Sequence, residues 1–209
     1  MSGKTTKQSE GDGAPRRRNI RSEQSVRKLI DSAVEELSRS PYSELSVRSV
    51  AARAAVSPTT AYTYFPSKDA LIAEAYLRLL RHAAVFTDVN HSVEARVSAQ
   101  VRELALLVAD RPYLADACTI ALMADEPVVN DARIQIAAEI SRRISDSLGP
   151  GYSPEVASTL HMLFSGGMMH ARSAVGGYRL IADQLDKAVA LILRSDLACL
   201  AEDLGQVGL

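Results

Sequence analysis

Three prolines divide residues 40–68 into very short helical segments. Pro41 and Pro66 each end a helix, because a proline ring disfavours helical backbone at the residue before it. Pro58 instead suits the first position of a helix, where a missing N–H costs nothing. The segment is therefore predicted to hold two very short helices, residues 47–54 and 58–65, joined by a turn at residues 55 and 56.

Serines and small side chains define the two faces of this helix pair. Ser46, Ser57 and Ser67 each precede a predicted helix and are expected N-caps, with the hydroxyl oxygen accepting from an exposed amide. The four inward residues of the first short helix are Val47, Val50, Ala51 and Ala54. In the second short helix Ala61 and Phe65 are predicted to face inward. The small side chains allow the two helices to approach closely.

Amphipathic periodicity predicts helices along the rest of the chain. Apolar residues recur at helical spacing over residues 23–37 and 67–80. Five further helices are expected near 92–111, 112–125, 127–148, 154–176 and 178–203, separated by proline and glycine. Aromatic residues make up only 5% of the chain, and no run alternates in the manner of a strand. The predicted fold is all-α, with an N-terminal three-helix unit and a C-terminal helical bundle.

Basic residues are concentrated at the N-terminus. Residues 1–21 contain six basic and two acidic residues, whereas the whole chain has a net charge of −1. Polar residues without an apolar period predict a disordered arm, and a basic leader suits contact with DNA at one end. The alternative is a solvated tail that aids solubility. We expect residues 1–21 to form this arm, residues 22–68 the three-helix unit and residues 69–209 the body.

The helix pair has the character of a helix-turn-helix, whose second helix enters the major groove of DNA. Four residues on one face of the second helix carry the expected contact groups: Pro58, Thr59, Tyr62 and Thr63. Thr60 and Tyr64 flank that face and suit phosphates, as does Lys68 at the start of the next helix. Arg48 is expected to make a bidentate contact with guanine. The alternative is an alanine-rich helical hairpin with no role in DNA binding.

The ordered run from Leu45 to Ala51 and from Ala55 to Leu71 resembles the signature of the TetR family, over about residues 22–80. The resemblance implies phosphate contacts at Ser46, Thr60, Tyr62, Tyr64 and Lys68, and base contacts at Arg48, Pro58, Thr59 and Thr63. The chain departs from the family at Ala55, where glycine is usual in the turn. It departs again at Pro58-Thr59, which replaces a frequent Lys-Gly or Arg-Gly pair and leaves open which bases are read. The cluster Arg16-Arg17-Arg18 is a candidate for the adjacent minor groove.

By resemblance the C-terminal helices form a dimerisation and effector-binding domain. A broad apolar stripe on the last helix and small residues on the helix before it agree with a four-helix bundle between two subunits. The expected interface residues are Gly166, Gly167, Ala171, Ala174, Ile181, Leu185, Ala188, Val189 and Ile192. The alternative is that this stripe is the core of a single subunit.

An apolar effector cavity is expected in the same domain. The candidate lining residues are Tyr113, Cys118, Met123, Phe164, Met168 and Met169, with His161, His170 and Arg172 as polar anchors. The alternative is that these residues are plain core. Residues 111–117 and the last two helices bear a diffuse similarity to actinobacterial TetR-family regulators of steroid catabolism, which implies a lipid-like effector or a CoA thioester. His161 and His170 are nine residues apart on opposite helix faces, and no metal site or cofactor is predicted.

These features together indicate a DNA-binding transcriptional regulator. The expected mechanism is repression at a palindromic operator, relieved when a small, largely apolar ligand shifts the population away from the DNA-binding state. A ligand-independent regulator or an activator would share the same features, and a protein-binding helical adaptor is a further alternative. The sequence lacks catalytic motifs, and Asp131 and Glu139 are interpreted as helix-surface charges, so an enzyme is not expected. Two isolated cysteines and a polar leader predict a cytoplasmic protein.

Overall fold

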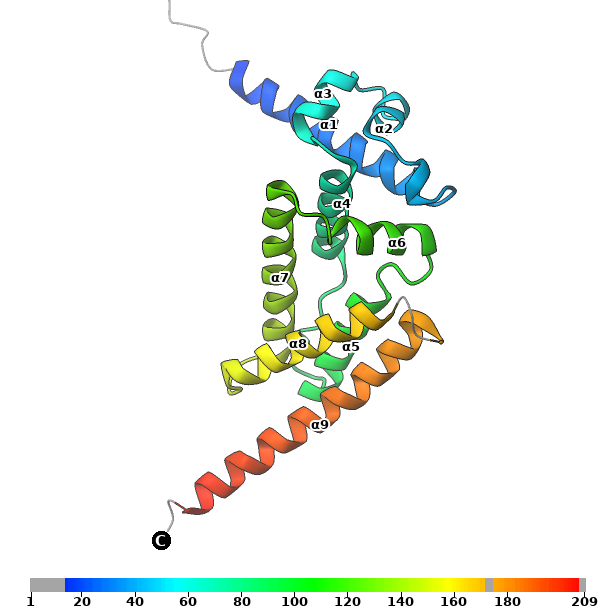
Figure 1. The fold of residues 1–209 in the computed structure, drawn as a ribbon. Helices are drawn as coiled ribbons and strands as arrows, with labels where there is room; N and C mark the ends of the chain where they lie inside the picture. Colours follow the sequence, from blue (N-terminus) through cyan, green and yellow to red (C-terminus); the bar gives the residue numbers. More distant parts are fainter. Residues whose placement is uncertain (1–13, 172–174, 207–209) are drawn as a thin grey trace, which may run out of the picture.

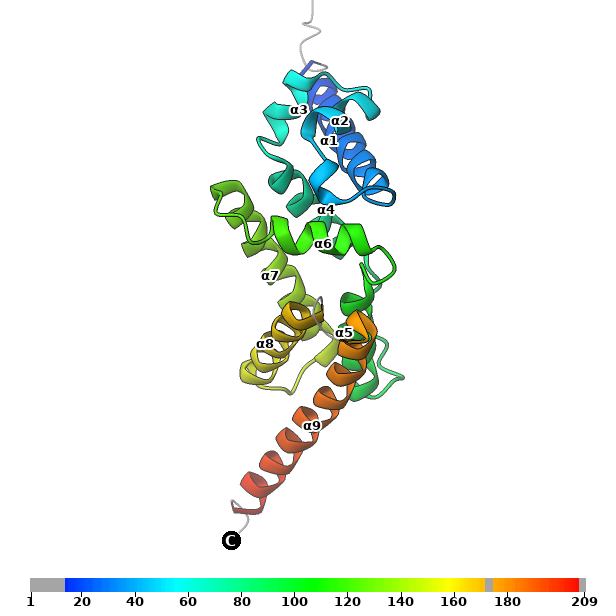
Figure 2. The ribbon, with the colours of Figure 1, turned by 45° about the vertical axis from the view of Figure 1, so that its right-hand side comes forward.

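The computed structural model describes residues 14–171 and 175–206, and the side chains of residues 21–171 and 175–194. Within these ranges all regular structure is helical and no strand occurs, so the predicted fold class is confirmed. Helices α1 to α3 form a small unit at one end of the molecule, and the long helix α9 extends toward the opposite end (Figures 1 and 2). No helix in the described ranges is long and apolar enough to cross a bilayer.

The helix boundaries follow the serines and prolines of the sequence. Ser46, Ser57 and Ser67 accept hydrogen bonds from amides three residues later, at 3.0–3.1 Å, as predicted for N-caps. Prolines occupy the first position of α3, α6, α7 and α8, where no N–H is needed. The elements are α1 (Ala14–Glu36), η1, a 3₁₀ turn (Tyr42–Glu44), α2 (Val47–Arg53), α3 (Pro58–Tyr64), α4 (Lys68–His82), α5 (Val93–Leu106), α6 (Pro112–Ala121), α7 (Pro127–Leu148), α8 (Pro154–Ala171) and α9 (Gly177–Gln206).

The start of α1 differs from the prediction. The helix begins at Ala14, so residues 14–21 of the expected disordered arm are helical. Pro15 lies in the first turn, where its missing N–H breaks no hydrogen bond, and no glycine follows it within the helix. Apolar periodicity locates only the part of a helix that packs on a core, and Figure 1 shows this end of α1 extending beyond α2 and α3. Apolar periodicity therefore did not predict the first turns of α1.

Helix α4 connects the three-helix unit to the body. Its residues pack against α1 on one side and against α6 and α7 on the other. Leu71, Ile72 and Leu77 are completely buried in a hydrophobic core that is continuous from α1 to α9. In the body α5 packs against α7 and α9, and α8 packs against α7 and α9. The orientation of α4 therefore fixes how the three-helix unit sits on the body.

A buried arginine closes the C-terminal end of α4. Arg143 of α7 is only 1% exposed, and its guanidinium donates to the carbonyl oxygens of Ala83 and Ala84 at 3.0 and 3.1 Å. These two residues come immediately after His82, the last residue of α4, and the Ala84 carbonyl also accepts from the Gln100 side chain at 3.3 Å. The Arg143 guanidinium also donates to Glu139 at 2.7 Å. Hydrogen bonds from Arg142 and Arg143 lower the pKa of Glu139, which is half-buried rather than the ordinary surface charge expected.

Two further arginines close helix ends in the same way. Arg96 of α5 donates to the carbonyl oxygens of Ser147 and Leu148, at 3.0 and 3.2 Å, at the end of α7. Arg133 of α7 donates to the carbonyl oxygen of Leu122 at 2.9 Å, at the end of α6. Charged donors make strong hydrogen bonds to such carbonyls. Tertiary contacts from arginine therefore satisfy carbonyls at the ends of α4, α6 and α7.

Candidate nucleic-acid interface

Helices α2 and α3 pack as the close pair that the sequence predicts. Val50 and Ala51 of α2 and Ala61 of α3 are completely buried between them. Ser46 and Ser49 form a capping box, in which each side chain accepts a hydrogen bond from the other's backbone N–H at 3.0 and 3.2 Å. This arrangement fixes the start of α2.

Ala55 makes the turn between the two helices with left-handed backbone. Its φ is 53°, a region that L-residues other than glycine rarely occupy. The Ala55 N–H donates to the carbonyl oxygen of Ala52 at 3.2 Å, and the Val56 N–H donates to that of Ala51 at 3.0 Å. These two bonds form a Schellman motif, which usually has glycine at this position. The departure from the family therefore leaves the turn geometry intact at a conformational cost.

One face of α3 presents polar groups to solvent. Thr59 and Thr63 are exposed, and the Tyr62 side chain is 49% exposed, next to the exposed Pro58. Ala61 faces the opposite way into the core. The Thr63 hydroxyl donates to the carbonyl oxygen of Thr59 at 2.9 Å, which fixes its orientation and leaves its acceptor lone pairs outward. The hydroxyl-bearing side of α3 is therefore open to a duplex.

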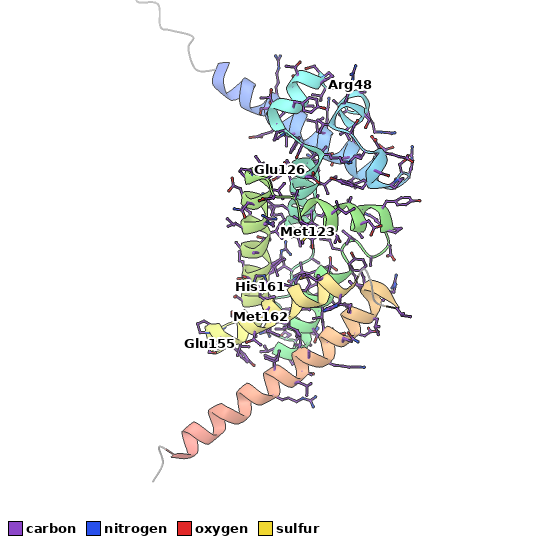
Figure 3. All side chains as sticks on the ribbon, in the orientation of Figure 1. Arg48, Met123, Glu126, Glu155, His161 and Met162 are labelled. Carbon is purple, nitrogen blue, oxygen red and sulfur yellow. The ribbon has the colours of Figure 1, made fainter. Side chains whose placement is uncertain are left out.

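The flanking residues of α3 are half-buried. The Thr60 hydroxyl lies 2.8 Å from the Ser57 hydroxyl in the N-cap, and Tyr64 packs against the hydrophobic core. Arg48 and Ser46 of the neighbouring helix are exposed. Figure 3 shows Arg48 at the end of the molecule farthest from His161 and Met162 of α8. The predicted contact residues of α2 and α3 thus lie together on one end of the protein.

Lys68 lies beside this surface but has partners within the protein. Its ammonium donates to the carbonyl oxygen of Tyr42 at 3.0 Å and lies 4.0 Å from the centre of the Tyr42 ring. The Tyr42 hydroxyl in turn donates to Asp69. Burial raises the pKa of Tyr42, and the hydrogen bond to Asp69 raises it further. A phosphate contact by Lys68 remains a prediction that requires its ammonium to turn outward.

The N-terminus of α4 is also tied to the body. The Ser67 hydroxyl donates to the carboxylate of Glu126 at 2.6 Å, at a half-buried position. Glu126 immediately precedes α7 and is the last residue of the segment that links α6 to α7 (Figure 3). Sequence reasoning gave Ser67 only the role of an N-cap. The position of Glu126 before a proline does not predict its hydrogen bond with Ser67, which lies 59 residues away in the sequence.

An apolar cleft of about 300 Å³ opens between α4, α6 and α8. It contains four of the predicted effector residues: Cys118, Met123, Met168 and Met169. Burial raises the pKa of Cys118 to about 12, so its sulfur is a neutral thiol. The residues that line the cleft are Tyr76, Val108, Ala115, Cys118, Thr119, Leu122, Met123, Met168, Met169 and Tyr178.

Other predicted effector residues lie elsewhere. His161 faces α7, where its Nδ1 lies 2.8 Å from the Ser141 hydroxyl, and burial lowers its pKa. Phe164 is buried in the core, and Tyr113 is exposed on α6 outside the cleft. His170 lines a second groove, and Arg172 lies outside the described residues. Sequence reasoning also missed Tyr76 and Tyr178, because an inward tyrosine in an apolar stripe looks like ordinary core.

The predicted dimer residues divide into a buried and an outward set. Ala171, Ile181, Leu185 and Val189 are buried within the protomer, and Ala188 and Ile192 are half-buried. A groove of about 580 Å³ between α8 and α9 is lined by Gly166, Gly167, Ile181 and Leu185 together with Thr159, Met162, Leu163, His170 and Gln184. The absence of a side chain at Gly167 brings Ile181 close, since an added Cβ would lie 3.1 Å from it. Ala174 and the side chains of Arg16, Arg17 and Arg18 lie outside the described residues.

The helix pair with an outward polar face, carried on a helical body, defines a helix-turn-helix DNA-binding protein. Residues 29–75 match the domain described as bacterial regulatory proteins, tetR family. The chain is 46% identical over 178 residues to proteins described as uncharacterized HTH-type transcriptional regulators from Mycobacterium tuberculosis and Mycobacterium bovis, and 84% of each chain is covered. The protein therefore belongs to the TetR family of DNA-binding transcriptional regulators. These relationships indicate a regulator rather than an enzyme.

Solved structures share the fold. A TetR transcriptional regulator from Rhodococcus sp. RHA1 has a TM-score of 0.71 at 19% identity, over 83% of this chain and 97% of that one. A TetR variant from Acinetobacter baumannii AYE, in complex with minocycline, has a TM-score of 0.56 at 16% identity, over 80% of this chain and 96% of that one. At such identities the likeness concerns the path of the backbone and leaves the site chemistry to the residues of this chain.

Proposed function

We propose that the protein is a repressor that binds a palindromic operator as a homodimer and leaves it when a small, largely apolar ligand binds. The observation that carries this proposal is the position of α4, which connects the DNA-reading unit to the apolar cleft. Ser67 at its N-terminus follows the DNA-reading helix by three residues, and Tyr76 in its second half lines the apolar cleft. A ligand beside Tyr76 acts directly on the element that carries the DNA-reading unit.

Operator reading is assigned to the outward residues of α2 and α3. Arg48, Thr59 and Thr63 are proposed to meet base edges, together with Pro58, while Tyr62 binds phosphate. Ser46, Thr60, Tyr64 and Lys68 are proposed phosphate contacts at the rim. Two copies of α3 must match half-sites roughly 34–36 Å apart, so a change in the tilt of α4 weakens binding to both at once.

The basic segment at the start of α1 is proposed to reach the minor groove. Arg16, Arg17 and Arg18 lie in the first turns of a helix, so neutral substitution tests them more cleanly than truncation. Replacing all three with glutamine should weaken DNA binding and make the binding constant less sensitive to salt, by about one unit of slope for each phosphate that is no longer neutralised. An unchanged salt slope would reject a DNA contact here.

The dimer is assigned to the outward faces of α8 and α9. Met162 and Leu191 are 74% and 71% exposed on these helices, and the groove between them is lined mainly by apolar residues. Large exposed apolar side chains on adjacent helices are typical of an interaction surface. A Met162→Glu change should convert the dimer to a monomer in sedimentation and weaken operator binding, whereas Thr59→Ala should weaken binding without changing mass.

The decisive experiment is selection of genomic fragments by the purified protein, followed by footprinting. A protected palindrome, lost in Tyr62→Ala but retained in the surface control Arg39→Ala, supports operator recognition. Transcription from the neighbouring promoter then separates the alternatives. Repression relieved by a ligand supports the proposal, whereas increased transcription would identify an activator. Absence of any selected sequence, with salt-insensitive duplex binding, would favour a protein-binding adaptor.

A further inference from the structure

The chemistry of the cleft between α4, α6 and α8 specifies what it binds. None of the ten described residues that line it carries a charge. The Cys118 thiol stays protonated near neutral pH, and burial raises the pKa of the Tyr76 hydroxyl, so this group is neutral as well. An ionised ligand would lose its hydration in the cleft without gaining a counter-charge from any of these ten residues. The described lining therefore favours uncharged ligands.

Sulfur and aromatic groups dominate the remaining lining. Met123, Met168 and Met169 contribute thioethers, and Tyr76 and Tyr178 contribute rings. Thioethers are polarizable and make favourable contacts with aromatic rings, and tyrosine rings pack well against other rings. A flat aromatic molecule satisfies both kinds of surface. The polar side-chain groups of the described lining are three hydroxyls and one thiol, so we expect the polar part of the ligand to be small.

The size of the cleft limits the part of a ligand that it can enclose. A volume of about 300 Å³ lies at the small end of the range of roughly 300–1,000 Å³ for ligand pockets. A dry apolar cavity of roughly 150 Å³ holds a benzene molecule. The cleft accordingly has room for two or three rings. A CoA thioester is much larger and carries several phosphates, for which the described lining offers no cationic partner.

We propose that this cleft binds uncharged aromatic molecules of two or three rings bearing at most one or two hydrogen-bonding groups. The inference rests on the proposed function only in treating the cleft as the effector site. It differs from the lipid-like or CoA-thioester effector that the sequence similarity implies. Met123 and Met169, which are 74% and 76% exposed, flank the entrance. Their flexible side chains adapt to different ring shapes.

Two dyes that share one aromatic skeleton test the charge rule. N-phenyl-1-naphthylamine is neutral, and 8-anilino-1-naphthalenesulfonate adds a sulfonate. Both become fluorescent in apolar surroundings, so each can be titrated against the full chain without DNA. We expect saturable binding of the neutral dye and at least about tenfold weaker binding of the sulfonate. Equal affinity for both dyes, or tighter binding of the sulfonate, would overturn the proposal.

Matched tryptophan variants test the location. Thr119 lines the cleft, whereas the adjacent Ile120 is 41% exposed and lies outside it. Thr119→Trp should weaken binding of the neutral dye by at least about tenfold, and Ile120→Trp should leave it unchanged. If Thr119→Trp does not fold, Met123→Trp obstructs the entrance from an exposed position. Undiminished binding in the folded cleft variant would place the dye elsewhere and refute the assignment.

Release from DNA is measured separately, with the operator fragment that the protein selects. Neutral dye that binds in the cleft but does not dissociate the DNA complex would support the ligand class and count against ligand-controlled repression. Dissociation by the sulfonate alone, with Thr119→Trp insensitive, would support repression and overturn the ligand class. The two proposals can therefore fail independently.

Discussion

The starts of the helices in the three-helix unit and the ends of the helices in the body are satisfied by different means. In α2, α3 and α4 one N-terminal amide is satisfied by the serine three residues earlier. In the body the C-terminal carbonyls of α4 and α7 are satisfied by arginines 51 to 60 residues away in the sequence. Local caps act in any surroundings, whereas distant caps exist only when the whole body is folded. The C-terminal helix ends of the body therefore depend on individual distant side chains, although Ser92 caps the start of α5 locally.

The largest effect should come from breaking a distant cap. Arg143→Leu removes the buried donor of the Ala83 carbonyl and one of the two donors of the Ala84 carbonyl, and it removes a buried partner of Glu139. We expect a loss of about 3–5 kcal/mol in the free energy of unfolding, measured by urea denaturation at fixed protein concentration. Arg142→Ala is the control, because Arg142 binds the same Glu139 from a side chain that is 52% exposed. It should cost about 1 kcal/mol at most, and equal losses would contradict the distinction.

A change on the DNA-reading surface should affect binding and leave the body intact. Arg48→Ala should weaken operator binding by roughly 1–3 kcal/mol and relax specificity at one base pair of each half-site. Because Arg48 is exposed, the unfolding midpoint should not change. Competition between operator variants provides the measurement, with Arg39→Ala as a charge-matched control outside α2 and α3. A uniform loss across all sequences would show that Arg48 binds phosphate.

The contact between the two regions should have an intermediate effect. Glu126→Ala removes the acceptor of the Ser67 hydroxyl, which links α4 to the start of α7. A half-buried bond to a charged group contributes roughly 1.5 kcal/mol. The amides of Ala70 and Leu71, which donate to the hydroxyl and the carbonyl of Ser67, should therefore exchange about tenfold faster with solvent, while those of α5 keep their rates. Asp125→Ala removes an adjacent exposed carboxylate and should not change either rate. Equal acceleration in both variants would point to a charge effect.

The same division explains which features were predictable from sequence. Ser46, Ser57 and Pro58 act within one helical turn, so they located α2 and α3 and oriented the outward residues Thr59 and Thr63. The overall order of helices followed from apolar periodicity and proline positions. Features of this kind depend on neighbours along the chain, and the sequence contains those neighbours in full.

Features that depend on distant partners were not predictable. Arg142 and Arg143 are adjacent in sequence, yet one is exposed and the other is 1% exposed beneath the end of α4. The cleft contains four of the expected residues, but Tyr76 enters it from α4 and His161 turns away to Ser141. Neither outcome follows from helical spacing, because spacing gives a face and does not identify what packs on it.

The smallest expected effect on stability concerns the strained backbone of Ala55, which lies among locally capped helices. Ala55 has a φ of 53° in the turn after α2, where an L-residue costs roughly 1–2 kcal/mol. Glycine relieves this cost but adds about 0.5–1 kcal/mol of chain entropy in the unfolded state. Ala55→Gly should therefore stabilise the protein by about 0.5–1 kcal/mol, raising the thermal midpoint by roughly 1–4 °C.

Ala52→Gly, in helical backbone on the same exposed side, should destabilise by about 1 kcal/mol. Opposite signs at two alanines three residues apart would show that backbone conformation alone decides the effect, whereas a loss in both would mean that the turn tolerates alanine without strain.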